Sequence, residues 1–479
     1  MIGSVFGLAV QSGSALTSFQ IPIDEAEITS YIESEMQRHR LKGVSVAITQ
    51  GDDVRYLSGF GTDGDGNPVT EDTPFFIGSV SKSFTALAVM QLVDEGLVDL
   101  DTPAQDYIPW FTTADPELSS RITIRQLLNQ TSGLSDGSFR RPLITEETTL
   151  EETVRHLKEA QLTTSPGTTF HYFNPNYNVL AQVIEAVTGK SFPDYVVENI
   201  FNPLDMTHSF VELEPAIDAG LANGHNYFFG FPIARQQPFN PADLAAGYMI
   251  STARDMTNYV IAQNNEGLFN NFPVASPRAV STMHTPPPSV ETDYAMGWIA
   301  TEVNGISTIR HNGSLEAFYS DVILLPDYDI GVVLMINQNA LLPLTMTYIP
   351  LADGLVNVVL GNEPAPGPSM RMVYAIISII ALLDLLRHGI ILTRIPVWFK
   401  NVERKNPWRQ YLGIFWKHAL FPLVLAFLIT LIYLNAGTNA TRATLFYFIP
   451  DIGLWLIISA LLSLVEGGIK IRKLIKHTA

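Results

Sequence analysis

The sequence predicts an α+β domain followed by an all-α membrane domain. Three observations support this prediction. Short strand-like runs lie at both ends of the front part of the chain, and the residues between them, about 80–290, have the spacing of helices and loops. Long apolar runs are confined to the C-terminal part. The charge of the chain also changes sign where these apolar runs begin.

Charge divides the 479-residue chain into two parts. The segment from Arg371 to the end holds 13 of the 29 Lys and Arg residues but only 4 of the 47 Asp and Glu residues, so it carries +9 and the preceding segment carries −27. A front part this acidic repels phosphate backbones, which argues against nucleic acid as a partner. Cysteine is absent, which excludes disulfides, thiolate catalysis and cysteine metal sites.

The local patterns of the front part predict its elements in chain order. An amphipathic helix is expected at 24–41, and further helices at about 79–95, 123–129, 150–160 and 176–188. Strands are expected at 43–49, 54–60, 297–303, 306–311, 319–325 and 331–337. We therefore expect one antiparallel sheet built from both ends of a domain at 21–362, with a helical insertion between them.

Three transmembrane helices are predicted at about 371–393, 416–434 and 444–465, after a Pro/Gly-rich linker at 363–370. Each run approaches the roughly 20 residues that cross a bilayer. Basic residues lie between the first two runs and in the tail, so both segments are expected to be cytoplasmic by the positive-inside rule: Arg394, Lys400, Arg404, Lys405, Arg409 and Lys417, then Lys470, Arg472, Lys473 and Lys476. The neutral connector at 435–441 then lies outside. An odd number of spans makes the chain a multi-pass cell-membrane protein whose front domain is extracellular or periplasmic.

Two further features bear on this membrane placement. Residues 1–20 are expected to be a signal sequence, because Met1–Ala15 is apolar and then small, although it is short and lacks a basic start. Asp384 and Arg387 lie three residues apart inside the first apolar run. Charges inside a membrane are costly, but this pair can neutralise itself, so we expect a structural role.

Ser79 and Lys82 form a Ser-x-x-Lys motif at the start of the helix predicted at 79–95. Residues three apart share a helix face, so the amine can reach the hydroxyl. A serine hydroxyl is a weak nucleophile until a neighbouring base takes its proton, and a lysine does this only in its neutral form. The motif alone is weak evidence, since about one is expected by chance in a chain of this size.

Other motifs strengthen this interpretation. They are Tyr172-Phe-Asn174 within Phe170–Gly189, His311-Asn-Gly313-Ser314, and Ile122–Leu134 with its Asn-Gln-Thr-Ser-Gly-Leu ending. Together with Ser79-x-x-Lys82 they resemble the serine β-lactamase and penicillin-binding-protein superfamily, in its class C β-lactamase, D,D-peptidase and class VIII esterase branch. The resemblance spans roughly residues 24–360. The C-terminal layout is similar to that of membrane-bound peptidases that mature prodrugs by removing an N-acylated D-amino acid.

The resemblance implies a role for each motif residue. Ser79 is expected to be the nucleophile, while Lys82 and Tyr172 share the general-base and general-acid work. The N–H groups of Ser79 and Ser314 would form the oxyanion hole. The resemblance also implies that Asn174 hydrogen-bonds both Lys82 and the acyl side chain of the substrate, and that His311 and Gly313 line the substrate site, where the glycine admits the substrate backbone.

His311 departs from the lysine that penicillin-recognising members often carry. Because a histidine is charged only in part near neutral pH, efficient β-lactamase action is in doubt. We expect hydrolysis of an amide or ester through an acyl-enzyme, with a peptide of D-residue or cell-wall type as the first candidate. A lipolytic esterase, a β-lactamase and a non-catalytic penicillin-binding or sensing protein remain alternatives. The expected partners are this substrate and the lipid bilayer, and no metal or cofactor is expected.

Two other segments need an interpretation. Gly133-Leu-Ser135-Asp-Gly137 fits the Gly-x-Ser-x-Gly pattern of α/β-hydrolases, but that turn needs a strand before it and a helix after it. Here a predicted helix ends just before it, so Ser135 is not expected to be the nucleophile. The aromatic segment 223–232 either lines the acyl pocket or packs into the domain core.

Overall fold

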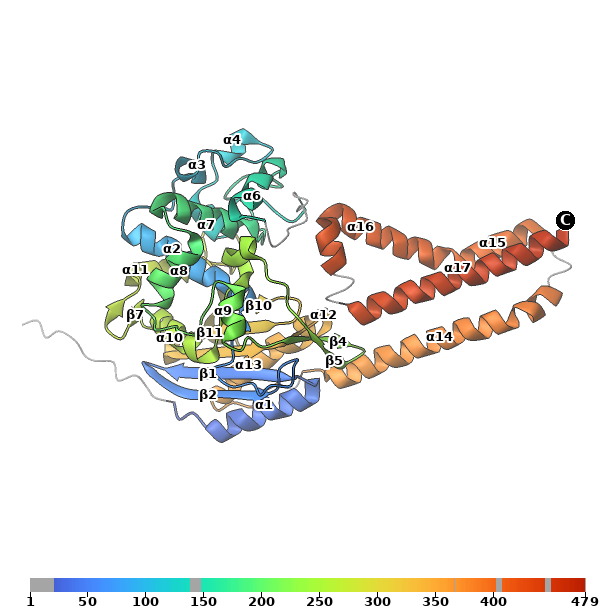
Figure 1. Cartoon of the computed structure of the whole chain (residues 1–479), viewed down its shortest axis with the longest axis horizontal. Helices are drawn as coiled ribbons and strands as arrows, with labels where there is room; N and C mark the ends of the chain where they lie inside the picture. The colour runs from blue at the N-terminus through green and yellow to red at the C-terminus, as the bar shows by residue number, and fades with distance from the viewer. Residues whose placement is uncertain (1–20, 138–147, 366, 402–406, 444–448, 479) are drawn as a thin grey trace, which may run out of the picture.

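The strand-like runs from the two ends of the front part pair into one six-stranded sheet, in the order β2-β1-β12-β11-β10-β9 (Figure 1). The computed structural model describes residues 21–137, 148–365, 367–401, 407–443 and 449–478. Every neighbouring pair in this sheet is antiparallel. The strands are β1 (Gly43–Gln50), β2 (Asp53–Gly61), β9 (Ile299–Val303), β10 (Ile306–Ser314), β11 (Tyr319–Leu325) and β12 (Ile330–Ile336). The predicted α+β class and sheet are confirmed.

Alternation along the central strands gives the sheet two apolar faces. In β12, Val332 and Leu334 belong to one hydrophobic cluster, whereas Val333 belongs to the other. The first cluster lies under α1 (Glu25–His39) and α13 (Ile349–Val359). The second lies under α2 (Ser81–Asp94), α10 (Ala253–Asn264) and the helical part. Because helices cover both faces, the central strands are buried along their whole length.

The helical part carries side-chain caps where its helices begin. Thr123 and Thr149 each form a capping box, at the starts of α5 (Ile124–Leu128) and α6 (Leu150–Arg155). Other helices here are α3 (Ala104–Tyr107), α4 (Pro116–Ser119), α7 (Pro175–Thr188), α8 (Phe192–Val196), α9 (Leu213–Asp218) and α11 (Pro277–Met283). Short two-stranded pairs join β3 (Phe75–Phe76) to β6 (Ile250–Ser251) and β7 (Leu268–Phe269) to β8 (Phe272–Pro273).

The aromatic segment 223–232 forms a hairpin that packs against the C-terminal helices. Its strands are β4 (Gly224–Phe228) and β5 (Phe231–Arg235), in a second sheet with β13 (Gln338–Asn339). Tyr227 stacks on Tyr374 of α14 (Met370–Lys400), with ring centroids 5.3 Å apart. The Phe229 N–H donates to Asp451 at the start of α17 (Pro450–Thr478), 2.8 Å away. The expected burial of this segment holds only in part: Tyr227 is buried, but in a cluster with Met370 and Tyr374 of α14, whereas Phe228 and Phe231 are exposed. The alternative, that the segment lines the acyl pocket, stays a prediction.

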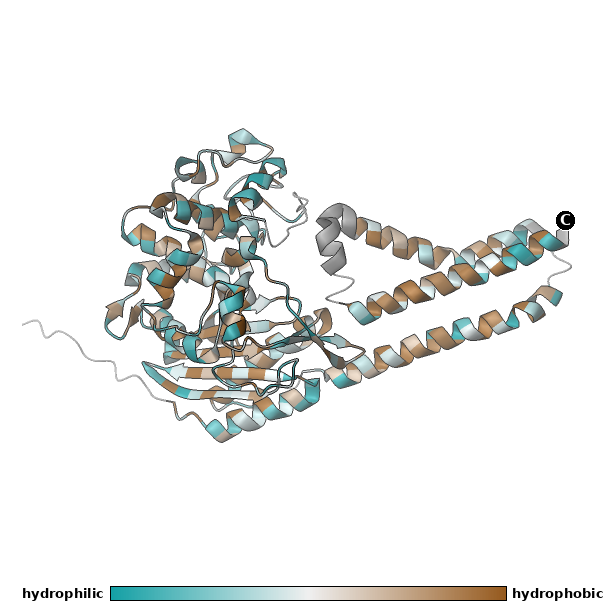
Figure 2. Ribbon diagram, viewed as in Figure 1, coloured by the Kyte–Doolittle hydropathy of each residue, from teal (hydrophilic) through white to brown (hydrophobic). Residues whose placement is uncertain are grey.

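The C-terminal part contains helices with the length and hydropathy of membrane spans. Met370–Lys400 and Pro450–Lys476 each qualify alone, and Trp408–His418 with Leu420–Leu431 qualifies as one pair bent by 46°. This pair belongs to α15 (Pro407–His418) and α16 (Leu420–Ala443). The helix of α16 continues through the expected connector at 435–441, which keeps the backbone groups of that segment hydrogen-bonded. Figure 2 shows the apolar character of these helices.

One further helix meets the same test. Leu341–Val359 is long and apolar enough, but 61% of its window is buried inside the domain. It consists of α12 (Leu341–Pro343), a π-helical turn and α13, which lies on the sheet. A helix that is apolar because it belongs to a large core needs no membrane. The expected leader at 1–20, and Arg404 and Lys405 of the basic connector, lie outside the described residues.

Charged side chains connect the C-terminal helices to one another. Arg387 Nη2 lies 2.8 Å from Asp384 Oδ1, as their spacing predicts. Glu466 of α17 is fully buried, and its carboxylate oxygens lie 2.7 Å from His388 Nδ1 of α14 and 3.1 Å from His418 Nδ1 of α15. The pair at 384 and 387 is therefore one end of a polar cluster that spans three helices.

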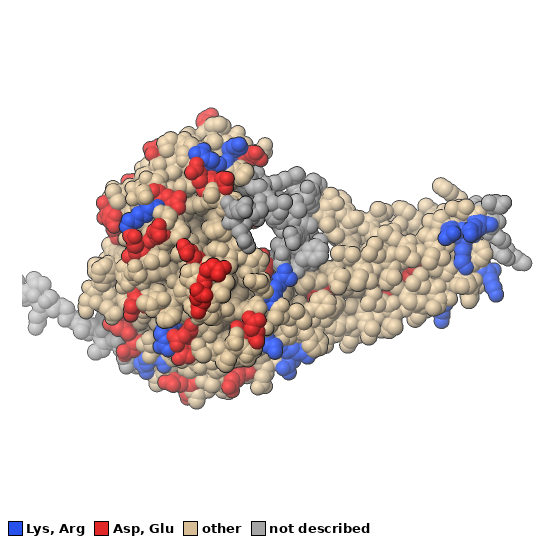
Figure 3. All heavy atoms as spheres, in the orientation of Figure 1, with Lys and Arg blue, Asp and Glu red and all other residues tan. Residues whose placement is uncertain are grey.

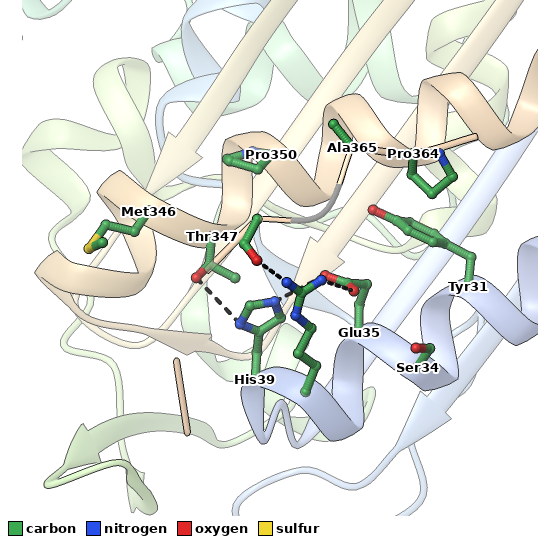
Figure 4. Close-up of a pocket in the computed structure, with 11 residues that line it drawn as sticks. Tyr31, Ser34, Glu35, His39, Met346, Thr347, Pro350, Pro364 and Ala365 are labelled. Carbon is green, nitrogen blue, oxygen red and sulfur yellow. Dashed lines mark hydrogen bonds and ion pairs between the residues drawn. The ribbon is translucent and has the colours of Figure 1, made fainter. Parts of the chain in front are cut away.

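The linker before α14 is packed against α1. Arg38 donates to the Gly367 carbonyl, and the Ser369 hydroxyl donates to the Arg38 carbonyl at 3.2 Å. His39 receives the Met370 N–H on Nδ1 at 3.4 Å and donates from Nε2 to Glu35 at 3.0 Å. Figure 4 shows Glu35 and His39 of α1 beside a small cavity that Pro364 and Ala365 also line. These contacts fix the direction in which α14 leaves the domain.

Candidate active site

Ser79 lies in a 3₁₀ turn, Gly78–Val80, between β3 and α2. Gly78 has φ +53°, and a Cβ built on it would lie 2.7 Å from the Ser314 nitrogen. Only glycine combines this backbone conformation with so close an approach. The glycine therefore brings the turn that carries Ser79 against the end of β10, where the N–H of Ser314 lies.

Lys82 lies in the first turn of α2 and is completely buried. Its Nζ lies 3.1 Å from Ser79 Oγ and also donates to the Ala246 carbonyl. The rings of Tyr172 and Tyr177 flank the amine, with centroids 4.9 and 5.7 Å from Nζ. The position therefore brings the lysine amine within hydrogen-bonding distance of the serine hydroxyl in a site closed to solvent.

Tyr172 lies in the loop before α7, with its hydroxyl hydrogen-bonded to Ser79. The side chain is 37% exposed overall, but desolvation raises the pKa of its hydroxyl well above the ordinary value. The hydrogen bond from Ser79 opposes the increase, and the nearby charge of Asp136 adds to it. Tyr172 is thus a neutral phenol in the resting site, which suits proton donation better than proton acceptance.

Gln130 holds the loop that carries Tyr172. Its side-chain oxygen accepts from the Phe173 N–H at 3.1 Å and from Asn176 Nδ2 at 2.6 Å, while its carbonyl accepts from the His171 N–H at 2.9 Å. Ser132 Oγ donates to Asn176 Oδ1 at 2.8 Å. The Asn-Gln-Thr-Ser-Gly-Leu motif therefore acts as a support for the tyrosine, a role that the sequence analysis did not assign to it.

Asn174 is the last residue before α7 and is half-buried. Its Oδ1 is buried and accepts no hydrogen bond from the described residues. The expected hydrogen bond from Lys82 to Asn174 is therefore not formed, since Lys82 donates to Ser79 and to the Ala246 carbonyl instead. A buried acceptor without a donor is costly, so this oxygen is suited to an N–H of a bound molecule.

His311 is buried in β10 and is held in one tautomer. Its Nδ1–H donates to the Asn312 carbonyl at 2.7 Å, and Nε2 lies 3.5 Å from the Tyr294 hydroxyl. Burial, with a further contribution from the charge of Lys82, lowers the pKa of His311 to about 3. The side chain is therefore neutral throughout the physiological range and offers no positive charge to a carboxylate.

The structure shows why position 313 must be a glycine, which the motif alone does not reveal. A Cβ at this position would lie 2.0 Å from the Ile77 carbonyl oxygen and 2.5 Å from Ser320 Oγ. Ser320 donates to the same carbonyl at 2.6 Å. The glycine thus allows β10 to lie against the chain just before Ser79, and Ser314 ends the strand beside it.

Tyr294 is the main site residue that the sequence analysis missed. It is buried between the rings of Phe170, Tyr172 and His311, with centroids 5.4, 5.8 and 5.8 Å from its own. Its hydroxyl donates to Tyr177 at 3.4 Å. A single tyrosine in a loop carries no motif, and only the fold brings it beside His311.

Ser135 lies away from a strand–turn–helix arrangement, as predicted. It follows α5 and a short turn, and its Oγ accepts from Thr163 Oγ1 at 3.3 Å. No group of three or more His, Asp or Glu side chains in the described part of the chain is arranged to hold a metal ion.

The depressed pKa of His311 predicts a loss of stability in acid. The unfolded chain binds a proton on this side chain below its ordinary pKa of 6.5, whereas the folded chain does so only near 3. The free energy of unfolding should therefore not depend on this group above about pH 6.5. Below that pH it should fall by up to about 1.4 kcal/mol per pH unit for the one proton that the unfolded chain binds. We expect His311→Gln to flatten this slope in denaturation of the full chain in detergent between about pH 4 and 8. His208→Gln, at an exposed position, should leave the slope unchanged; equal slopes in both variants would contradict the prediction.

Comparisons with known proteins agree with this geometry. Residues 28–347 match the family described as Beta-lactamase. Protein flp of Staphylococcus aureus (strain COL) is 28% identical over 320 residues, which cover 66% of this chain and 64% of that protein. Unguisins hydrolase ungD' of Aspergillus campestris is 28% identical over 342 residues, covering 66% and 62%. The matched region thus spans less than two thirds of either relative.

The octameric penicillin-binding protein homologue from Pyrococcus abyssi superposes with a TM-score of 0.60 at 26% identity, over 71% of this chain and 78% of that one. The chain belongs to the beta-lactamase family.

Proposed function

We propose that the chain is a membrane-anchored serine hydrolase that forms an acyl-enzyme on Ser79. The observation that carries this proposal is the fully buried Lys82 amine, 3.1 Å from Ser79 Oγ. If Ser79 only capped the start of the helix and Lys82 were a solvated surface residue, neither the burial of the amine nor the two tyrosine rings beside it would be needed. The hydrolase named among the relatives supports the same class of reaction.

The reaction proceeds in two halves. Lys82 takes the Ser79 proton while Oγ attacks the carbonyl carbon, and the N–H groups of Ser79 and Ser314 hold the resulting oxyanion. The tetrahedral species collapses as Tyr172 donates its proton to the leaving nitrogen or oxygen and regains one from Lys82. Water then attacks the Ser79 ester by the reverse order of proton transfers, which releases the acid and restores the serine.

The residues around Ser79 favour a substrate that carries no carboxylate near the reacting carbonyl. His311 is neutral, and Asp136 lies close enough to Tyr172 to raise its pKa, so the surroundings of Ser79 disfavour added negative charge. Asn174 Oδ1, which accepts no hydrogen bond from the residues that the structure describes, is suited to an amide N–H of the acyl side. We therefore place a peptide or acyl amide of D-residue or cell-wall type first. A lipolytic esterase comes second, and a β-lactamase of the same branch comes third.

The C-terminal helices support the anchoring half of the proposal. The α14 helix is only 11% buried in its most apolar window, so its surface needs an apolar solvent. Figure 3 shows Lys and Arg side chains at the end of the helices far from the domain, and many Asp and Glu side chains on the domain itself. By the positive-inside rule the far end faces the cytoplasm and the domain faces outward.

Labelling of Ser79 by an active-site probe tests this function. Membranes that contain the full chain are treated with a fluorophosphonate or a fluorescent penicillin, and the adduct is mapped by mass spectrometry. We expect the adduct on Ser79, none with Ser79→Ala, and unchanged labelling with Ser135→Ala. If Ser79 stays unlabelled where a control hydrolase is labelled, the chain is instead a non-catalytic member of its family. Turnover of cephalosporins alone, without D-aminoacyl amides or p-nitrophenyl esters, would overturn the substrate preference.

A further inference from the structure

Basic side chains gather where the acidic domain meets the first C-terminal helix (Figure 3). A surface cavity of about 710 Å³ lies at this junction, between α1 and the residues that follow it, the end of β2, the hairpin β4–β5 and the start of α14. Arg40, Lys42 and Arg371 line it, together with apolar groups and a single carboxylate, Glu33. Arg40 and Lys42 belong to the part of the chain that carries −27 overall, and Arg371 is the first residue of the part that carries +9.

The three basic groups keep their charge available to a ligand. Among the described residues, neither Arg40, Lys42 nor Arg371 forms an ion pair with a carboxylate. Arg40 is held by its neighbours without being neutralised, because Nη1 donates to the Gly230 carbonyl at 2.9 Å and the guanidinium lies 4.6 Å from the centroid of the Phe231 ring. Unneutralised cations around one cavity are suited to a phosphate group.

The cavity lies at the boundary between polar and apolar surface. Arg371 is the second residue of α14, and the exposed apolar face of that helix begins immediately after it, with Met372 60% and Ile376 51% exposed. The hairpin adds Phe231 and Ile233, which are 60% and 53% exposed. Aromatic and apolar side chains next to cations are typical of the interfacial region of a bilayer.

The depth of the cavity relative to α14 is fixed by packing. A Cβ on Gly230 would lie 2.6 Å from Tyr374 Cβ, so the hairpin tip lies directly on α14. The hydrogen bonds of Arg38 and His39 to residues 367–370 hold α1 against the same helix. The cations are therefore held just above the apolar surface of α14 and do not depend on a free linker for their position.

We propose that this cavity binds the phosphate headgroup of an anionic phospholipid, whose acyl chains lie along the exposed face of α14. The inference rests on the membrane placement proposed above. Arginine pairs with phosphate oxygens through two N–H groups, and lysine adds a point charge. A zwitterionic headgroup adds its own cation and gains less from the site.

Native mass spectrometry of the full chain in detergent tests this site. Phosphatidylglycerol and phosphatidylcholine are titrated separately, and the ratio of their dissociation constants is measured. Loss of one basic side chain near a lipid phosphate weakens binding about fivefold, equivalent to about 1 kcal/mol. We expect Lys42→Gln with Arg371→Gln to lower the preference for phosphatidylglycerol about 25-fold. Both side chains are exposed, so the substitutions leave the fold intact.

Matched variants and a soluble competitor make the test specific. Lys158→Gln with Arg278→Gln removes two exposed cations elsewhere on the domain and should leave the preference unchanged. The exchange Lys42→Arg with Arg371→Lys should retain most of it. An unchanged preference in the double Gln variant would overturn the site, and so would equal competition by glycerol phosphate, which would identify a site for soluble phosphate. Extraction of the chain by alkaline carbonate would overturn the membrane placement itself, whereas Ser79 labelling reports on the hydrolase independently.

Discussion

Replacement of Lys82 by methionine is expected to slow the acylation of Ser79 by about 10²- to 10⁴-fold. Methionine has a similar unbranched shape but cannot take the proton of Ser79, whose Oγ lies 3.1 Å from the lysine amine. The measurement is the rate of labelling by a fluorophosphonate under single-turnover conditions with the full chain. Lys158→Met, which changes an exposed lysine of the same domain, is the matched control and should label at the rate of the wild type.

The alternative base in this site is Tyr172, and its variant separates the two roles. Burial raises the pKa of Tyr172 well above its ordinary value, so a tyrosinate is disfavoured in the resting site. Tyr172→Phe should therefore reduce turnover through the lost proton donor, with a smaller effect on labelling by a probe whose leaving group needs no proton. If Lys82→Met labels normally while Tyr172→Phe does not, the tyrosine is the base and the assignment is reversed.

The sheet could be predicted from the sequence because its signals are local. Short runs of apolar and β-branched residues mark the strands, and turn residues such as Asn304-Gly305 and Pro326–Asp329 separate them. Strand-like runs at both ends of the domain predicted one shared sheet, but the sequence did not predict that β1 and β12 are the strands that join the two ends. The contact between Ser79 and Lys82 could also be predicted, because the 3₁₀ turn that carries Ser79 runs directly into α2 and residues three apart share one face.

The rest of the site depends on contacts that carry no sequence signal. The acceptor for Lys82 is the carbonyl of Ala246, and any residue at that position supplies a carbonyl. Tyr294 and Gln130 reach the site from loops whose placement is a consequence of the whole fold. The partner of the hairpin at 224–235 could not be predicted for the same reason, because its aromatic residues indicate burial without indicating that the partner is α14.

The substitution Gly313→Ala is expected to reduce acylation of Ser79 by about 10²- to 10³-fold, comparable to the loss of one oxyanion-hole donor. The added Cβ would lie 2.0 Å from the Ile77 carbonyl oxygen, which belongs to backbone and cannot rotate away. Either β10 or the turn before Ser79 must move, and both changes separate the N–H of Ser314 from that of Ser79. Overpacking of this kind also costs about 1–3 kcal/mol of stability, so labelling must be normalised to the folded fraction.

Gly137→Ala provides the control for this effect, because it adds the same methyl group at a position of the same domain where the nearest atom lies 3.7 Å away. It should label at the rate of the wild type. If Gly313 instead served only to admit the substrate backbone, Gly313→Ala would bind a large substrate less well but would still react normally with a small fluorophosphonate. The strong loss with the small probe is therefore the result that distinguishes positioning of the oxyanion hole from exclusion of the substrate.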